Sequence, residues 1–229
     1  MKVMKNIVLL IISGIALTGC TTLTEKQKEM LTTVSIRPHE AIENAFHDPD
    51  GTASPNAGES VPAATGGGLI PALIGSAIDK GVTSSQRKSF NEDNQQYFEE
   101  VNRTTPKDVV QQLQARATKV LKEDSFFGPR LTEGSDNYFD GEILDYGLKR
   151  AHKTDGKIYL GASLSIKVWL MGSDGKKMFT QILTISSKDS YTMAQYATDD
   201  TLTSKVFLQA MDDFEEKFKS MLDWKLGRK

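Results

Sequence analysis

The sequence predicts an α+β fold: a mainly antiparallel sheet with a C-terminal meander and helices packed on one face, which makes a two-layer sandwich. Two observations lead to this prediction. Every even position from Ile158 to Leu170 is apolar, and a Gly172–Gly175 turn then leads into a second apolar run over residues 177–187. Residues 201–226 instead repeat apolar side chains at helical spacing, so they are expected to cover the apolar face of the sheet.

The chain begins with a predicted export signal over residues 1–19. Lys2 and Lys5 precede an apolar core of about 11 residues, shorter than the ~20 residues that span a bilayer. The core ends in "LTGC", where Gly19 precedes Cys20, the only cysteine of the chain. This stretch resembles the lipobox of bacterial lipoproteins. The resemblance implies cleavage between Gly19 and Cys20 and attachment of lipid to the Cys20 sulfur.

The same resemblance predicts where the protein is held. Because a single acyl chain binds a membrane only marginally, stable anchoring takes several chains on the lipidated Cys20. Thr21, rather than Asp, follows the cysteine. In the lipoprotein sorting rule this implies the outer membrane of a Gram-negative envelope, with the protein on its periplasmic face.

Composition narrows the partners of the remaining chain. Removal of Lys2 and Lys5 leaves 26 of the 28 basic residues against 30 acidic residues, a net charge of −4. The basic residues are scattered, so the sequence predicts no nucleic-acid partner. With Cys20 carrying lipid no disulfide is available, and the fold depends on its core. The sequence indicates no cofactor and leaves self-association into a homo-oligomer open.

A polar segment over residues 20–31 predicts a tether, followed by a single domain over residues 32–229. Within that domain, Val34 and Ile36 alternate with polar neighbours and predict a short strand over residues 32–38.

Two contrasting segments follow this strand. Residues 47–68 hold three prolines and five glycines, which predicts a long flexible loop. From Leu69 to Ile78 apolar residues recur at helical spacing, and small residues stand four apart at Gly68, Ala72 and Ser76. This predicted helix either covers the sheet or contacts a membrane or a partner.

The next elements alternate between helix and strand. A helix is predicted from Thr105, as its cap, to about Asp124, with Pro106 in the first turn. Aromatic residues before a Gly-Pro break then turn the chain toward a strand that begins at Tyr138. On this strand the sequence places three residues on one side: Leu144, Tyr146 and Leu148.

The order of these elements resembles that of certain envelope lipoproteins. The segments that carry the resemblance are the lipobox, the "KEDSFFG" turn, the "YFDGEI" strand, the hairpin over "MGSDGKK" and the closing helix. Over residues 105–226 they are similar to relatives of the curli secretion lipoprotein, the amino-terminal domain of the Tol-system translocation protein and auxiliary lipoproteins of ABC-type transporters. The resemblance implies a non-catalytic protein that assembles with other envelope proteins.

Three fragments match motifs of penicillin-recognising enzymes: Ser85–Lys88 as S-x-x-K, Ser135–Asn137 as S-D-N and Lys153–Gly156 nearly as K-T-G. The last two begin only 18 residues apart, with one strand between them, and the third lies where a meander needs a turn. Metal motifs are also incomplete, because Glu43 occupies the second histidine position of the H-E-x-x-H pattern that begins at His39. The sequence therefore predicts neither an enzyme nor a metal site.

The function predicted is that of a lipid-anchored periplasmic lipoprotein, a non-catalytic assembly or accessory component of an envelope complex. Four apolar residues are predicted to contact the partner protein: Leu69, Leu73, Ile74 and Trp169. Trp169 is chosen because it lies on the mostly polar face of its strand and tryptophan is enriched in binding hot spots. The alternative is a carrier that encloses a lipid or another small apolar ligand in a cavity of several hundred Å³ between helix and sheet, within the ~300–1,000 Å³ of known ligand sites.

Overall fold

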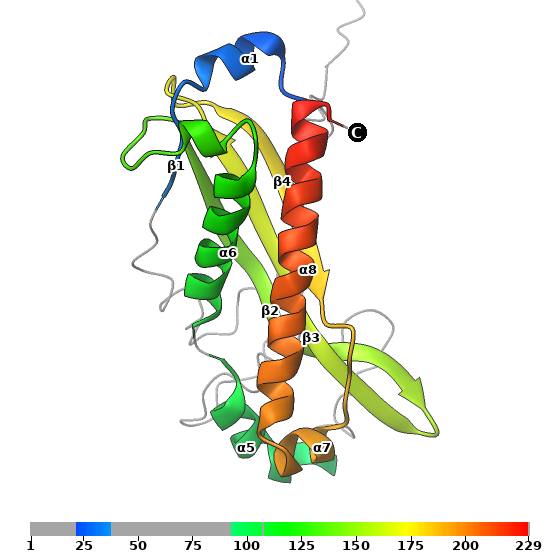
Figure 1. Ribbon diagram of the computed structural model, residues 1–229. Coiled ribbons are helices and arrows are strands. Elements are labelled where there is room, and N and C mark those ends of the chain that lie inside the picture. The colour runs from blue at the N-terminus through cyan, green and yellow to red at the C-terminus, as the bar shows by residue number, and fades with distance from the viewer. Residues whose placement is uncertain (1–21, 38–92, 107, 229) are drawn as a thin grey trace, which may run out of the picture.

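A computed structural model describes residues 22–37, 93–106 and 108–228 (Figure 1). Its sheet has the strand order β1 (Ser35–Ile36), β2 (Tyr138–Thr154), β3 (Lys157–Met171) and β4 (Lys177–Ser186). β2, β3 and β4 form an antiparallel meander, and β1 pairs with β2 in parallel. The predicted α+β class with a mainly antiparallel sheet is confirmed. β1 is shorter than the predicted strand over residues 32–38.

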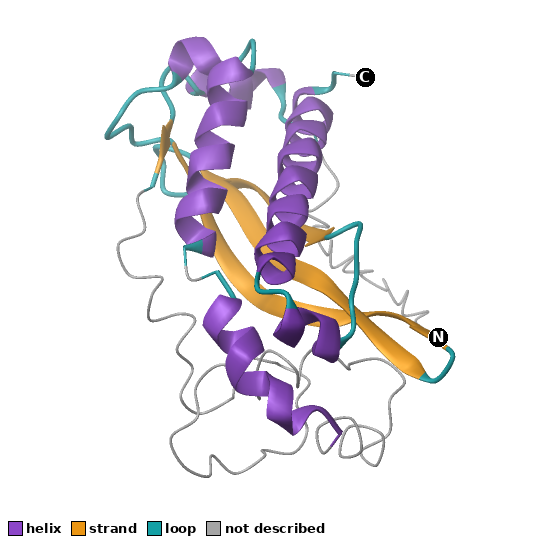
Figure 2. Ribbon diagram, turned by 60° about the horizontal axis from the view of Figure 1, so that its bottom comes forward, coloured by secondary structure: helices purple, strands orange, loops and turns teal. Residues whose placement is uncertain are grey.

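Two helices cover one face of this sheet. α6 (Val109–Glu123) and α8 (Thr201–Leu226) run side by side across it in both views (Figures 1 and 2). Arg116 of α6 joins the pair, because its guanidinium lies 2.8 Å from the Asp212 carboxylate and 2.7 Å from that of Glu215 on α8. The other face of the sheet carries no described helix.

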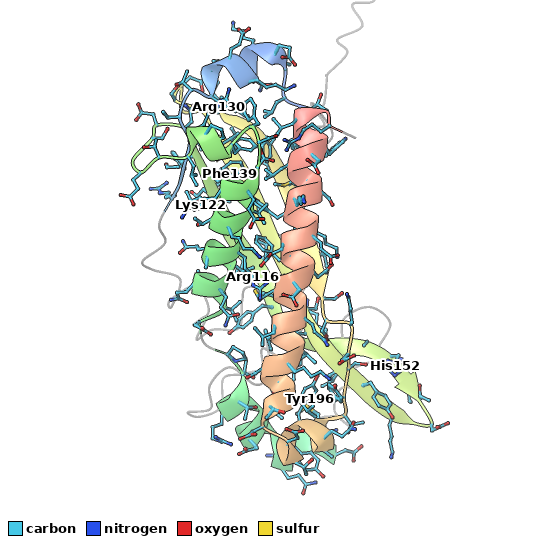
Figure 3. All side chains as sticks on the ribbon, viewed as in Figure 1. Arg116, Lys122, Arg130, Phe139, His152 and Tyr196 are labelled. Carbon is cyan, nitrogen blue, oxygen red and sulfur yellow. The ribbon has the colours of Figure 1, made fainter. Side chains whose placement is uncertain are left out.

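The apolar alternation of β3 matches its burial. Leu160, Leu164 and Leu170 are fully buried against the helices, while residues at the odd positions from 163 to 169 are half-buried. Tyr196, at the lower end of the molecule in Figure 3, is also fully buried and donates a 2.7 Å hydrogen bond from its hydroxyl to the Leu160 carbonyl oxygen. The predicted core face of β3 is therefore confirmed.

The prediction of which β2 residues share one side of the strand is wrong at one position. Ile143 pairs with Ile166 of β3, but the next pair is Asp145 with Ser165, so Leu144 is the extra residue of a β-bulge. An inserted residue reverses the alternation between the two faces. Leu148 is buried and Tyr146 packs against the core as predicted, but Ile143 takes the core position before the bulge.

α8 begins and ends where the sequence predicts, whereas the start of α6 differs. The predicted cap, Thr105, follows α5 (Phe98–Thr104) and donates a 2.8 Å hydrogen bond from its hydroxyl to the Val101 carbonyl oxygen. This bond satisfies a carbonyl in the last turn of α5, so Thr105 ends one helix instead of starting the next. α6 then begins at Val109, and its C-cap is Asp124 as expected. The smaller elements are η2 (Gln95–Tyr97), η3 (Gly128–Arg130) and α7 (Met193–Thr198).

The predicted tether over residues 20–31 is also corrected. α1 (Glu25–Met30) crosses the end of the sandwich beside the C-terminal end of α8 (Figure 1). Leu23 and Leu31, on either side of α1, are buried in the main core. Among the described residues, the packed core therefore starts at Leu23. The predicted signal over residues 1–19, the loop over residues 47–68 and the helix from Leu69 to Ile78 lie outside the described residues.

Candidate functional site

Of the predicted contact residues, the structure describes Trp169. It lies on the face of the sheet opposite the helices, with Asp140 of β2 and Thr180 of β4 as its neighbours across the strands. The residue is half-buried. The other predicted site residues lie outside the described residues: Gly19, Cys20, Leu69, Leu73 and Ile74.

Two lysines hold the Trp169 ring. The Lys177 Nζ lies 4.3 Å from the ring centroid, and the Lys167 Nζ lies 5.9 Å from it. Both distances are within the range of a cation–π interaction, which an ammonium makes with the electron-rich face of tryptophan. Lys167 is further held by Glu142 on β2, at 3.7 Å. The two cations therefore favour this orientation of the ring.

Ile182 extends this apolar surface to β4. Its neighbour across the strands is Lys167, two positions from Trp169, and its exposed fraction is 54%. The sequence analysis did not single out Ile182 as a site residue. The sequence did contain a signal for Ile182, because successive residues of a strand face opposite sides of the sheet. The buried residues of β4 all stand at odd positions, so the even-numbered Ile182 faces the other side; these buried residues are Phe179, Leu183 and Ile185. We call Trp169, Ile182, Lys167 and Lys177 the tryptophan patch.

The outer edge of β4 borders the tryptophan patch. Near the end of the strand two side chains of α8 cover this edge. The Lys217 Nζ donates to the Thr184 carbonyl oxygen at 2.7 Å, and the Ser186 N–H donates to the Asp213 carboxylate at 2.9 Å. Within the described part of the chain, no strand pairs with this edge and no helix side chain covers it at Thr180. A sheet edge with free N–H and C=O groups can accept an extended segment of another protein.

The fragments that match catalytic motifs have structural roles where they are described. Asn137 is buried: its side-chain amide donates to the Thr33 carbonyl oxygen at 3.0 Å, and its side-chain oxygen accepts from the Ser173 N–H at 2.9 Å. Asp155 and Gly156, both with positive φ, form the two-residue turn between β2 and β3. Ser85 and Lys88 lie outside the described residues.

Among the described residues, the side chains that could bind a metal are not gathered at one site. His152 stacks on Tyr159 with 4.6 Å between ring centroids (Figure 3), and the described chain has no group of three or more His, Cys, Asp or Glu residues suited to a metal. Asp189 forms an ion pair with Lys205 and accepts from Gln209, and these hydrogen bonds hold the pKa of the Asp189 carboxyl below its usual value. This ion pair ties the segment after β4 to α8.

The described residues enclose little space between helix and sheet. A cavity of about 80 Å³ lies between α6 and β2, with apolar lining residues such as Phe139, Val168 and Phe218. A larger hollow of about 310 Å³ opens at the α1 end of the molecule. Over the described ranges, no helix is both long enough and apolar enough to cross a membrane.

Comparison with known proteins finds solved structures that are similar to part of the chain. No family model and no curated protein matches the chain. A DUF330 protein from Xanthomonas campestris is similar at 11% identity and a TM-score of 0.35, over 51% of this chain and 60% of that one. A minor lipoprotein from Acinetobacter baumannii is similar at 18% identity and a TM-score of 0.35, over 50% of this chain and 81% of that one. This chain thus spans less than two thirds of the first structure.

Proposed function

We propose that the chain is a lipoprotein anchored through Cys20 in the outer membrane, on its periplasmic face, where it binds another envelope protein as an accessory component. The observation that carries the binding role is the tryptophan patch beside an open sheet edge. The described helices cover one face of the sheet, and on the other face Trp169 is half-buried and Ile182 is exposed. Lipid attachment is supported by the "LTGC" sequence that precedes the folded body.

The chemistry of the tryptophan patch favours an extended partner segment. A strand that pairs with the edge of β4 at Thr180 would place alternate side chains over Trp169 and Ile182. Lys167 and Lys177 flank the apolar residues, so acidic residues beside an apolar one would complete the match. Anchoring at a membrane raises the local concentration of the protein for a partner in that membrane, which lets a contact of this small size suffice.

The binding role is tested by photocrosslinking in intact cells. A photoreactive amino acid at Thr180 should give a defined crosslinked partner, and Trp169→Ala together with Ile182→Ser should remove it. The matched control is Leu208→Ser on α8, because Leu208 is exposed to a similar extent, 49%, on a different surface. An unchanged crosslink in the Trp169 and Ile182 variant would contradict this site. The Leu73→Ser and Ile74→Ser changes test the second predicted surface in the same assay.

Anchoring is tested separately by metabolic labelling with palmitate and by membrane fractionation. The wild-type chain should take up the label and sediment with the outer membrane, and Cys20→Ser should do neither. A wild-type chain that stays unlabelled, or that is recovered as freely diffusing periplasmic protein, would overturn the anchoring part of the proposal.

The carrier alternative receives less support from the described residues. The cavity of about 80 Å³ between α6 and β2 is smaller than the ~300–1,000 Å³ of sites that enclose a small ligand. Phe139, Phe214 and Phe218, all buried, reach into the space that a ligand would need. Lipid recovered with the purified protein in a fixed ratio, beyond the chains on Cys20, would favour the carrier.

A further inference from the structure

The start of the folded body lies at one end of the sandwich. The Leu23 N–H donates a 2.7 Å hydrogen bond to the carbonyl oxygen of Lys225, in the last turn of α8. Thr22 is only two residues from Cys20, and two residues span at most about 7 Å. Lipid on Cys20 would therefore hold the α1 end of the molecule against the membrane surface.

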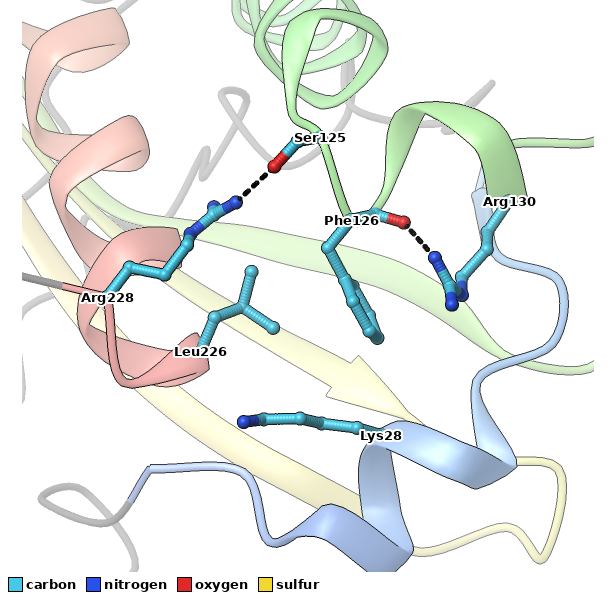
Figure 4. A pocket seen from close by; sticks show the side chains of 6 residues that line it. All are labelled: Lys28, Ser125, Phe126, Arg130, Leu226 and Arg228. Carbon is cyan, nitrogen blue, oxygen red and sulfur yellow. Dashed lines mark hydrogen bonds between the residues drawn. The ribbon is translucent and has the colours of Figure 1, made fainter.

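A hollow of about 310 Å³ opens at this same end (Figure 4). Three separate segments line it, namely α1, the turn after α6 together with η3, and the end of α8. The lining includes three cationic side chains and no carboxylate, and its residues are Lys28, Ser125, Phe126, Arg130, Leu226 and Arg228.

The three cations differ in how they are held. Arg228 is fixed by the carboxylates of Asp124 and Asp223 and donates to the Ser125 hydroxyl at 2.9 Å. Arg130 donates to the Phe126 carbonyl oxygen at 2.7 Å, and its guanidinium lies 4.1 Å from the Phe126 ring centroid.

Arg130 and Lys28 are the cations that can take up a ligand. Over the described part of the chain, Arg130 has no carboxylate within ion-pair distance, so the contacts with Phe126 orient it without neutralising it. The Lys28 Nζ has a partner in Glu25 at 2.8 Å; the Lys28 side chain is 21% exposed and the Glu25 side chain 84%. Because water solvates the carboxylate, this ion pair contributes little energy, and Lys28 can exchange Glu25 for another anion at low cost.

We propose that this hollow binds the phosphate group of a phospholipid in the membrane that carries the anchor; the proposal rests on the lipidation of Cys20 proposed above. A guanidinium presents a planar fork of donors that matches phosphate oxygens, and an ammonium adds a point charge. Phe126 and Leu226 provide apolar surface beside the cations, which suits the part of a phospholipid next to its phosphate.

Binding at the hollow would fix the orientation of the whole domain. Since an α-helix rises 1.5 Å per residue, the 26 residues of α8 place its first turn about 39 Å from the membrane-facing end. α7 and the turn between β2 and β3 lie toward that far end (Figure 1). The domain would then stand upright on the membrane instead of tilting freely about its lipid attachment.

The test uses the lipidated full chain in vesicles of phosphatidylethanolamine and phosphatidylglycerol with a nitroxide on the headgroups. Trp169→Phe leaves Trp224, in the last turn of α8, as the only tryptophan, and its fluorescence reports quenching at the α1 end. Lys28→Gln with Arg130→Gln is the test variant. The control, Lys153→Gln with Lys157→Gln, removes two exposed charges from the ends of β2 and β3 that flank their turn.

We expect strong quenching of Trp224 in the parent protein and in the control. Because each cation at an anionic surface contributes about 1 kcal/mol, the test variant should lower the docked-to-undocked ratio about 30-fold. Equal quenching in the parent and the test variant would overturn the proposal, as would an unquenched Trp224 in a chain that carries palmitate. A chain without palmitate would instead show that the anchoring proposal itself has failed. If the double variant unfolds in detergent, Lys28→Gln alone provides the comparison.

Discussion

The backbone N–H of Leu23 donates a 2.7 Å hydrogen bond to the carbonyl oxygen of Lys225 and so joins the two ends of the described chain. Lys225 is in the last turn of α8, where carbonyl groups have no intrahelical partner. The bond therefore satisfies an acceptor that the helix leaves open. This hydrogen bond fixes the backbone at Leu23, whose side chain is buried in the core. Because α1 follows directly, it is held at the end of the sandwich.

Leu23→Ala should destabilise the protein by about 2–4 kcal/mol, because truncation of a buried leucine loses apolar contacts and leaves a cavity. The exposed fraction of Leu23 is 3%, and its contacts belong to the main core. The measurement is urea unfolding of the lipid-free chain followed by circular dichroism. Met30→Ala, at an exposed position of α1, should change the stability by less than about 0.5 kcal/mol. Equal effects of the two changes would show that α1 is not docked as described.

Asn137→Ala should cost about 1–3 kcal/mol, the net contribution of two hydrogen bonds, although the fragment around it matches a catalytic motif. Asn137 is itself buried, and its side chain bonds to Thr33 before β1 and to Ser173 in the turn before β4, so its truncation removes both of these links. Asp136→Ala, at the exposed neighbouring position, should be close to neutral. Thermal unfolding of both variants is the measurement. A fully stable Asn137→Ala protein would contradict this role.

Gly128→Ala should destabilise the protein by at least about 2 kcal/mol, as overpacking does in a close-packed interior. A Cβ at this position would lie 2.5 Å from the Lys122 carbonyl oxygen, which is backbone of α6 and cannot easily move. The turn after α6 must approach the helix this closely to bury Phe127. The control is Gly141→Ala, where a Cβ would come no closer than 3.4 Å to the Lys167 carbonyl oxygen. Comparable urea midpoints for both variants would contradict the close approach.

The bounds and buried faces of an element could be predicted from the sequence where its apolar residues repeat at a regular spacing from end to end. β3 and α8 meet this condition, and both have the predicted bounds and buried faces. In β2 the extra residue Leu144 reverses the alternation, and a two-residue period cannot be read across such an insertion.

The helices α1 and α7 span only six residues each, and α1 is polar, so neither is long enough to show an apolar period. They do carry a readable local signal. Thr24 with Gln27, and Thr192 with Gln195, form capping boxes, the S/T-x-x-E/Q pattern at the start of a helix. Without the burial of Leu23, however, this pattern cannot tell a docked helix from an exposed one.

The candidate site was only partly predictable from the sequence. The alternating apolar residues of β3 were enough to place Trp169 on the polar face, because the face of a strand residue follows from its position in the strand alone. Ile182 and Lys177 depend on the register between β3 and β4, which the turn and a bulge between Leu170 and Met171 determine. The hollow at the α1 end joins residues about 200 positions apart, such as Lys28 and Arg228, and no local pattern brings these together.

Tyr146 should make the fold sensitive to alkali. Its ring packs against the core beside Leu164, and burial raises the pKa of its hydroxyl from 10.0 to about 12. Between these values the folded state retains a proton that the unfolded state has lost. Stability is therefore unaffected by this group below about pH 10 and falls as pH rises from about 10 to about 12.

The size of this fall can be estimated and tested. Two pKa units correspond to about 2.7 kcal/mol, and because the side chain is partly exposed, solvent screening reduces the expected fall to about 1–2 kcal/mol. Tyr146→Phe removes the titrating hydroxyl, so urea unfolding at pH 8 and pH 11.5 should show a smaller difference in the variant than in the wild type. Tyr196, whose pKa burial also raises, remains in both proteins and accounts for a residual fall. An identical loss of stability in wild type and variant would show that Tyr146 is ionised as readily in the folded state as in the unfolded chain, and hence that its ring is not packed against the sheet.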